Sequence, residues 1–116
     1  SAMQGNTAGV KNIGIGVQTL SSNTTGTTNV AMGVSALYGN TTGSRNVCLG
    51  VEAGYSTTTG DDNVALGTSA LYSNTTGKRN IAIGIGTEII WVFTIIFAAF
   101  LFGTILLIIH SFMGEF

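Results

Sequence analysis

The chain has 116 residues, a formal net charge of −1 and charged side chains at only 8% of its positions. This composition excludes a strongly basic nucleic-acid-binding surface and gives no electrostatic attraction to an anionic membrane. The single cysteine, Cys48, excludes an intramolecular disulfide framework. The length suffices for one domain, but the abundance of Gly, Thr and Asn is unlike that of an ordinary globule.

The first five residues are set aside from the fold. Ser1-Ala2-Met3 is typical of the remnant of an expression tag. We therefore interpret residues 1–5 as a tag or leader remnant, and we expect the chain to be a fragment of a longer protein.

Residues 6–87 are organised by a repeat of 17 residues, such as NTTGTTNVAMGVSALYG, with five units that start at Asn6, Asn23, Asn40, Thr57 and Asn74. Glycine in a fixed column indicates a positive φ or a lack of room for Cβ. Asparagine in a fixed column suits a turn whose side chain bonds to its stacked copies. The glycine columns are Gly9, Gly26, Gly43, Gly60 and Gly77, and Gly16, Gly33, Gly50, Gly67 and Gly84; the asparagine column is Asn12, Asn29, Asn46, Asn63 and Asn80.

Each unit contains two short apolar runs, exemplified by Val30-Ala31-Met32 and Ala36-Leu37-Tyr38. The first run has large residues at i and i+2, which predicts a strand with its large side chains packed. A unit of this length has room for two strands of about five residues and two turns. The repeat therefore predicts a mainly β protein, a parallel β-solenoid of five coils with a core of Val or Ile, Leu or Met, Ala and Leu.

So thin a core predicts association. Each coil buries few large side chains, worth about 1.5–3 kcal/mol each, against about 1–2 kcal/mol of backbone entropy for every ordered residue. We expect a homotrimer, in which sister chains cover the remaining apolar edge and the tyrosine column Tyr38, Tyr55 and Tyr72.

The NTTGxxNVALGxxAL pattern resembles the repeats of bacteriophage tail fibres, and it is similar to the head repeats of YadA-like trimeric autotransporter adhesins. The likeness covers residues 6–86 and recurs in all five units. It implies a trimeric, left-handed parallel β-roll used in attachment to a cell surface. The hydrophobic C-terminal region matches neither family's usual ending.

Residues 88–110 contain an uncharged stretch, IIWVFTIIFAAFLFGTILLII, that is long enough to cross a bilayer as a helix. We predict a mostly helical membrane segment here, followed by a short polar tail at residues 111–116. The alternative is a soluble tip in which three such segments are buried together in the trimer. The membrane-segment residues are Ile89, Trp91, Phe93, Phe97, Phe100, Phe102 and Ile109.

The sequence offers little for catalysis, and we expect no enzyme, cofactor or metal. His110 is the only histidine and follows the hydrophobic stretch. Asp61-Asp62 is an acidic pair in a turn column and occurs in one unit only. A calcium-binding solenoid repeats its aspartates in every coil, so we interpret the pair as part of a solvated turn. Cys48 stands in a column of small residues, where a packed thiol is expected.

We therefore expect a structural and adhesive fibre component on a virion or a bacterial cell surface. Its partners would be sister chains, an unidentified receptor or glycan, and membrane lipid, with no nucleic acid. Exposed, variable turns are where a repeat scaffold places recognition. The surface-contact candidates are Thr27, Thr28, Ser44, Arg45, Asp61, Asp62, Lys78 and Arg79. An ice-binding solenoid is a weaker alternative, because paired threonines such as Thr24-Thr25 do not form a flat Thr-x-Thr array.

Overall fold

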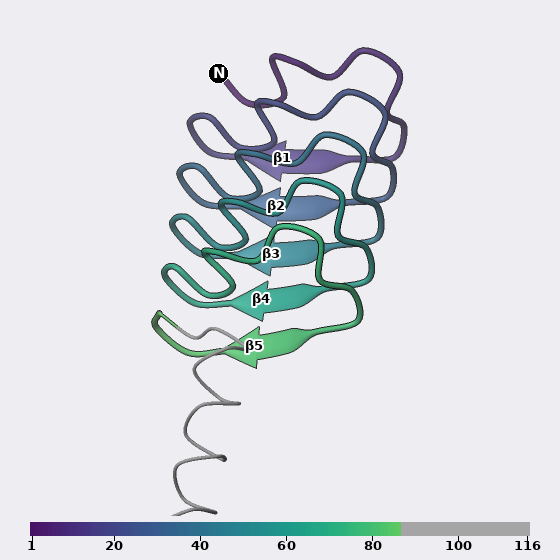
Figure 1. The fold of residues 1–116 in the computed structure, drawn as a ribbon. Coiled ribbons are helices and arrows are strands. Elements are labelled where there is room, and N and C mark those ends of the chain that lie inside the picture. The colour runs from purple at the N-terminus through teal and green to yellow at the C-terminus, as the bar shows by residue number, and fades with distance from the viewer. Residues whose placement is uncertain (87–116) are drawn as a thin grey trace, which may run out of the picture.

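The computed structural model describes residues 1–86, which wind into a β-solenoid of stacked coils (Figure 1). Each unit contributes one short strand, and neighbouring strands pair in parallel in the order β1-β2-β3-β4-β5. The register joins residues 17 apart, as in Ile13 with Val30. The predicted parallel solenoid is confirmed. The strands are β1 (Ile13–Ile15), β2 (Val30–Met32), β3 (Val47–Leu49), β4 (Val64–Leu66) and β5 (Ile81–Ile83).

The predicted asparagine column forms a continuous ladder through the solenoid. The Asn12 side-chain Oδ1 accepts from Asn29 N–H at 2.9 Å and from Asn29 Nδ2 at 3.3 Å. Asn29 Nδ2 also donates to the carbonyl of Gly43 in the next coil at 2.8 Å. The same bonds recur at Asn46 and Asn63, which are buried. The ladder therefore satisfies buried polar groups and fixes each coil over the next.

Two glycine columns let the coils approach each other closely. A Cβ at Gly26 would collide with the carbonyl oxygen of Gly43. Gly33 has a φ of +128°, and its Cβ would lie 2.5 Å from the carbonyl oxygen of Gly50. Glycine is therefore required by space in the column of Gly26, and by both space and backbone conformation in the column of Gly33.

The core differs from the prediction in which strand residues it contains. Ala31, Cys48 and Ala65, the middle residues of their strands, are buried, whereas the large flanking residues point outward and are half-buried or exposed. The predicted packing of Val or Ile and Leu or Met inside the coil is therefore wrong. The buried apolar residues are Leu20, Ala31, Ala36, Leu37, Cys48, Ala53, Ala65, Ala70, Leu71 and Ala82.

The second apolar run of each unit does not form a strand, which corrects the prediction of two strands per coil. Ser35 and Leu37 have φ values of 58° and 49°, in the left-handed region, so the chain bends repeatedly here. Its backbone still bonds to the coils on either side, with Ser35 N–H donating to Val17 and Leu37 N–H to Ala53. The bends turn Leu37 into the core.

One coil shows a compensating exchange of side-chain size. Gly54 stands in the column occupied by Leu37 and Leu71, and Cys48 stands in the column occupied by Ala31 and Ala65. A Cβ at Gly54 would lie 2.7 Å from Cys48 Sγ. The larger thiol therefore fills space that the missing leucine leaves free.

Residues 1–5 take part in the solenoid rather than standing outside it. Met3 N–H donates to Thr19 at 2.7 Å and Gly5 N–H to Ser21 at 2.8 Å. Met3 has a φ of 56°, like Leu20 and Leu37 in the equivalent column, and packs against the core. Ser1-Ala2-Met3-Gln4-Gly5 aligns with Ser35-Ala36-Leu37-Tyr38-Gly39, and these residues pair with the first coil as the end of a unit does.

The predicted hydrophobic segment at residues 88–110 and the tail at 111–116 lie outside the described residues. Within residues 1–86, no helix has the length and apolarity needed to cross a bilayer.

A second asparagine ladder is interrupted, and repairing it should stabilise the protein. Asn40 Nδ2 donates to Asn23 Oδ1 at 2.7 Å, but the buried Asn40 Oδ1 has no partner because Thr57 replaces the next asparagine. We expect Thr57→Asn to raise the free energy of unfolding by about 1 kcal/mol, since an unsatisfied buried group costs about 1–3 kcal/mol. Urea unfolding followed by circular dichroism measures the change. Thr59→Asn, at an exposed neighbour, is the control, and equal stability of the two variants would contradict the prediction.

Candidate functional site

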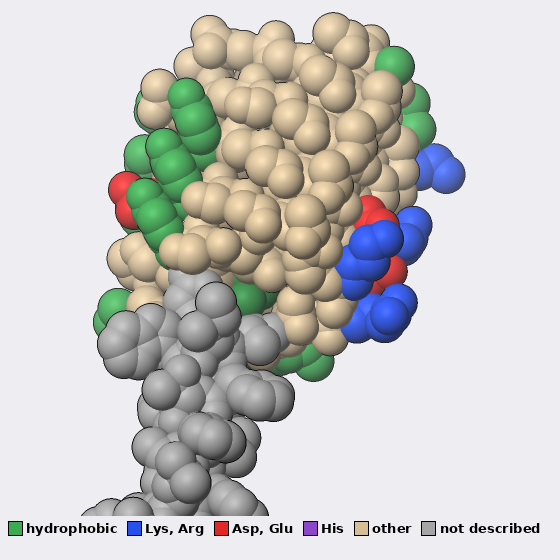
Figure 2. All heavy atoms as spheres, in the orientation of Figure 1, with side chains coloured by type: hydrophobic (Ala, Val, Ile, Leu, Met, Phe, Trp, Pro, Cys, Tyr) green, Lys and Arg blue, Asp and Glu red, His purple; other side chains and the backbone are tan. Residues whose placement is uncertain are grey.

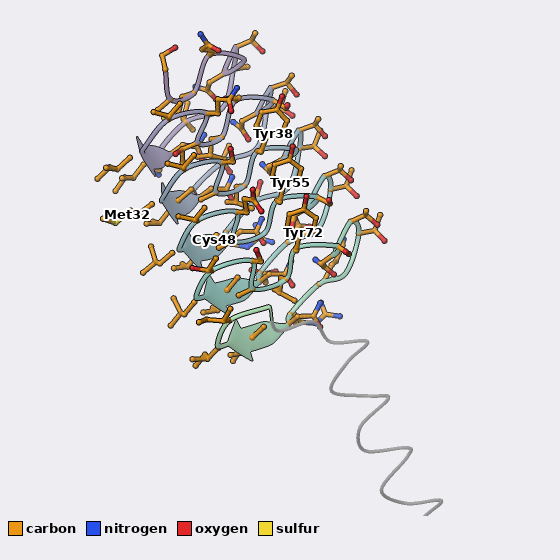
Figure 3. The ribbon with its side chains drawn as sticks, turned by 90° about the vertical axis from the view of Figure 1, so that its left-hand side faces the viewer. Met32, Tyr38, Cys48, Tyr55 and Tyr72 are labelled. Carbon is orange, nitrogen blue, oxygen red and sulfur yellow. The ribbon has the colours of Figure 1, made fainter. Side chains whose placement is uncertain are left out.

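The most conspicuous surface is the apolar strand face, formed by outward side chains in three columns. Two columns come from the strands and the third follows the glycine after each strand. Met32 points outward from the coil on this side, whereas Cys48 is buried inside it (Figure 3). The face comprises Ile13, Val30, Val47, Val64 and Ile81, then Ile15, Met32, Leu49, Leu66 and Ile83, then Val17, Val34, Val51, Thr68 and Ile85.

Large apolar side chains of this face are exposed to solvent. Ile15, Val34 and Ile83 are 55%, 46% and 67% exposed. No charged side chain stands in any of its three columns. A contiguous apolar surface of this kind marks an interaction site on soluble proteins.

The tyrosine column forms a stack on another side of the solenoid. The rings of Tyr38 and Tyr55 are parallel with centroids 5.0 Å apart, and those of Tyr55 and Tyr72 are 4.9 Å apart (Figure 3). Burial and the neighbouring tyrosines raise the pKa of Tyr55. Because each ring covers the next, the stack chiefly joins coils to one another.

The surface-contact candidates lie together along one charged edge, formed by the two residues before each Asn of the main ladder. All four basic residues of the chain, Lys11, Arg45, Lys78 and Arg79, stand in these two columns. Figure 2 shows basic side chains gathered along one border of the molecule with acidic ones between them. Four of the eight candidates are exposed and four are half-buried. The exposed ones are Thr28, Arg45, Lys78 and Arg79, and the half-buried ones are Thr27, Ser44, Asp61 and Asp62.

The candidates are engaged with each other, which the sequence did not reveal. Arg45 Nε and Nη2 donate to the two carboxylate oxygens of Asp62 at 2.6 and 3.1 Å. Lys78 Nζ lies 3.3 Å from Asp61. The hydrogen bonds from Arg45, and its charge, lower the pKa of Asp62. The charged edge is therefore partly a device that holds neighbouring coils in register.

The uncharged candidates also bond to residues of neighbouring coils along the charged edge. Ser44 N–H donates to Asp61 Oδ1 at 2.8 Å, and Thr27 N–H donates to Ser44 Oγ at 3.0 Å. Thr28 is exposed and has a φ of 59°, which places it at the corner before the strand.

The paired threonines lie in bends, not on a strand. Thr24, Thr25 and Gly26 all donate their N–H groups to the carbonyl oxygen of Thr41, at 2.9, 3.1 and 3.2 Å. Thr24 Oγ1 donates to the same oxygen at 3.1 Å. Thr41 Oγ1 and Thr58 Oγ1 donate to the backbone in the same way, to the carbonyl oxygens of Thr58 and Thr75. One hydroxyl of each of these three pairs is therefore bonded to the backbone, so these corners do not present a flat array of free hydroxyls.

Other chemical candidates give no site in the described part of the chain. Cys48 is 1% exposed, and burial raises its pKa to about 12, so the thiol is unreactive at neutral pH. Asn23 and Asn40, although followed by Thr-Thr, have buried amides that cannot accept a glycan in the folded protein. Among residues 1–86, no three His, Cys, Asp or Glu side chains are grouped to hold a metal ion. His110, Trp91 and the other membrane-segment residues lie outside the described residues.

The strand face was not identified from the sequence as a candidate functional surface, because its side chains were placed in the core. The sequence does contain a signal for this face. The alternation of large apolar residues at Val30, Met32 and Val34 continues past Gly33 and is therefore longer than a three-residue strand. Glu52 was not among the candidates either, and it is the one carboxylate among residues 1–86 without an ion pair.

Comparison of the chain with known protein-family models, with curated proteins and with solved structures finds no match.

The Arg45–Asp62 pair should make stability depend on pH. The pKa of Asp62 is lowered in the folded state from the usual aspartate value of 3.8. Its ionised carboxylate therefore stabilises the folded protein above that value, and this stabilisation is lost as the pH falls through the lowered pKa. We expect the urea midpoint of the native chain to fall more steeply from pH 5 to pH 2 than that of Asp62→Asn. Repeating the series in 1 M NaCl should shrink the difference, because salt screens exposed pairs. Parallel slopes at low salt would contradict the prediction.

Proposed function

We propose that this chain is a structural and adhesive fibre component whose copies associate through the apolar strand face. In the form we favour, three copies make a left-handed, threefold β-solenoid bundle that serves as the shaft or head of a cell-attachment fibre. The observation that carries the proposal is the row of outward Ile, Val, Leu and Met side chains on all five strands.

The small core supports this association. The buried apolar set is mostly alanine, with three leucines, so a single solenoid gains little from its interior. Burial of the strand face against sister chains would remove additional apolar surface from water, and each Å² contributes about 25 cal/mol. The likeness of the repeat to tail-fibre and YadA-like adhesin repeats supports the adhesive role and the threefold number.

We further propose that the hydrophobic segment at residues 88–110 secures or contacts a membrane, and that the charged edge contributes to recognition of a cell-surface receptor or glycan. The uncharged length of the segment supports the first part. The exposure of Arg45 and Lys78, with side chains 57% and 52% accessible, supports the second.

The self-association has a direct test in a surface substitution. Val34→Asp should dissociate the assembly, because a desolvated, unpaired carboxylate would replace about 1.5–3 kcal/mol of apolar burial, and 1.4 kcal/mol already changes an affinity tenfold. Light scattering of the full chain in detergent gives the mass. Thr25→Asp, at an exposed corner of the same coil, is the matched control and should keep the native trimer mass. A native chain that is monomeric, or two variants that behave alike, would overturn the proposal.

The membrane role can be followed through Trp91, the only tryptophan of the chain. We expect the full chain to float with phosphatidylcholine vesicles and its tryptophan emission to shift to shorter wavelength. Phe100→Arg should weaken both effects, because a central arginine costs about 2.5–3.5 kcal/mol on insertion scales. Phe116→Arg, beyond the segment, is the control. A native chain that stays with the soluble fraction as a trimer would favour the alternative, a soluble tip whose hydrophobic segments are buried together.

A further inference from the structure

The apolar strand face is bounded by two corners, and the charges on these corners are not symmetric. The chain enters the face at the column of Arg45 and leaves it at the column of Glu52, and both residues have positive φ, 58° and 57°. The entry border consists of Lys11, Thr28, Arg45, Asp62 and Arg79, and the exit border of Gln18, Ser35, Glu52, Ser69 and Gly86. One border is therefore basic overall and the other carries the single acidic residue Glu52.

Glu52 has no ion pair within its own chain, among the residues that the structure describes. Its side chain is half-buried at the rim of the face, in the same coil as Arg45. Arg45 is bonded to Asp62 but keeps an accessible guanidinium. The Glu52 carboxylate and the Arg45 guanidinium lie on opposite borders of one chain. The carboxylate of one copy could therefore pair with the guanidinium of another copy across an interface.

Two ways of joining copies through this face bring different borders together. If the copies run in parallel around a two- or threefold axis along the solenoid, the entry border of one copy meets the exit border of the next, coil for coil. Arg45 then lies opposite the partner's Glu52, and no like charges meet along the border. A slip by one coil would oppose Glu52 to Asp62 in one direction and leave it opposite Thr28 in the other.

Antiparallel association instead places each border opposite the same border of the other copy. Arg45 would then oppose Arg45, Glu52 would oppose Glu52, and Lys11 would oppose Arg79 at both ends. Like charges placed directly opposite at an interface are unfavourable, whereas complementary charges fix orientation and register.

We propose that the apolar strand face binds a second copy of this chain in parallel and in register, with Arg45 of one copy opposite Glu52 of the next. This inference rests on the proposed self-association. It adds the pair of charged residues that would favour the parallel, in-register arrangement over the alternatives. It makes every coil meet its own counterpart, so a fibre built this way presents all its charged edges at equal heights.

Single cysteines at the two ends of the face test the direction. Ile15→Cys lies in the first coil and Ile83→Cys in the fifth, about 19 Å apart at about 4.8 Å for each coil. With a short bismaleimide linker, parallel copies should cross-link Ile15→Cys to itself and Ile83→Cys to itself, with no mixed product when differently tagged variants are combined. Cys48 is buried with a pKa of about 12, so the native chain should give no product.

The failures are distinguishable. Mixed products with no self-products, from a chain that light scattering shows to be associated, would overturn the parallel arrangement. They would also exclude the threefold bundle, but they would leave self-association through the strand face intact. No product of any kind from a monomeric chain would overturn both. An associated chain that gives no product would show that the strand face is not the interface, which also overturns the inference.

Charge substitutions test the register independently. Glu52→Arg should weaken self-association at least tenfold, because it places two arginines opposite each other at every contact. Ser69→Arg, in the same border one coil lower, should leave self-association unchanged or strengthen it, because it would face the partner's Asp62. Equal effects of the two substitutions, or stronger self-association of Glu52→Arg, would overturn the proposed pairing.

Discussion

The structure depends on one constraint, the satisfaction of each coil's polar groups by the coil 17 residues away. Asn46 shows the arrangement most fully: its N–H and Nδ2 donate to Asn29 in the coil above, and its Nδ2 also donates to Gly60 in the coil below. Such a side chain can be buried only if both neighbours are present and in register. Stability is therefore shared between neighbouring coils, as in other repeat proteins, and each added coil extends the same interactions.

This constraint explains why the coil interior is so small. Gly26 and Gly33 bring successive backbones together, and the asparagine amides occupy volume that a globular protein fills with hydrocarbon. Only small residues such as Ala31, and one large column typified by Leu37, remain inside. The pair Cys48 and Gly54 shows how little freedom is left, because enlarging one residue requires reducing the other.

The sequence was sufficient for the period, the parallel stacking and the asparagine ladder, because these follow from columns that recur every 17 residues. It was not sufficient for the facing of the strand. Alternation of Val30, Ala31 and Met32 is the same pattern whichever face is buried, since a shift of one residue reverses every side chain. The interior width decides between the two, and that width is set by coil-to-coil contacts that no single segment reveals. The left-handed bends at Ser35 and Leu37 were equally hidden, because leucine rarely takes that conformation.

The reversed facing changes what the repeat means for function. A solenoid that buries its large apolar residues hides them within its own coils, whereas this one leaves them on the outer side of a single sheet. The proposed association of copies would cover that surface. The charged edge borders that sheet, and its own pairs, Arg45 with Asp62 and Lys78 with Asp61, already align coils within the chain. Because the coils are fixed at defined heights, any charge on the opposite border is also fixed in height. Intramolecular register is thus what would allow a lone carboxylate such as Glu52 to specify the register between copies.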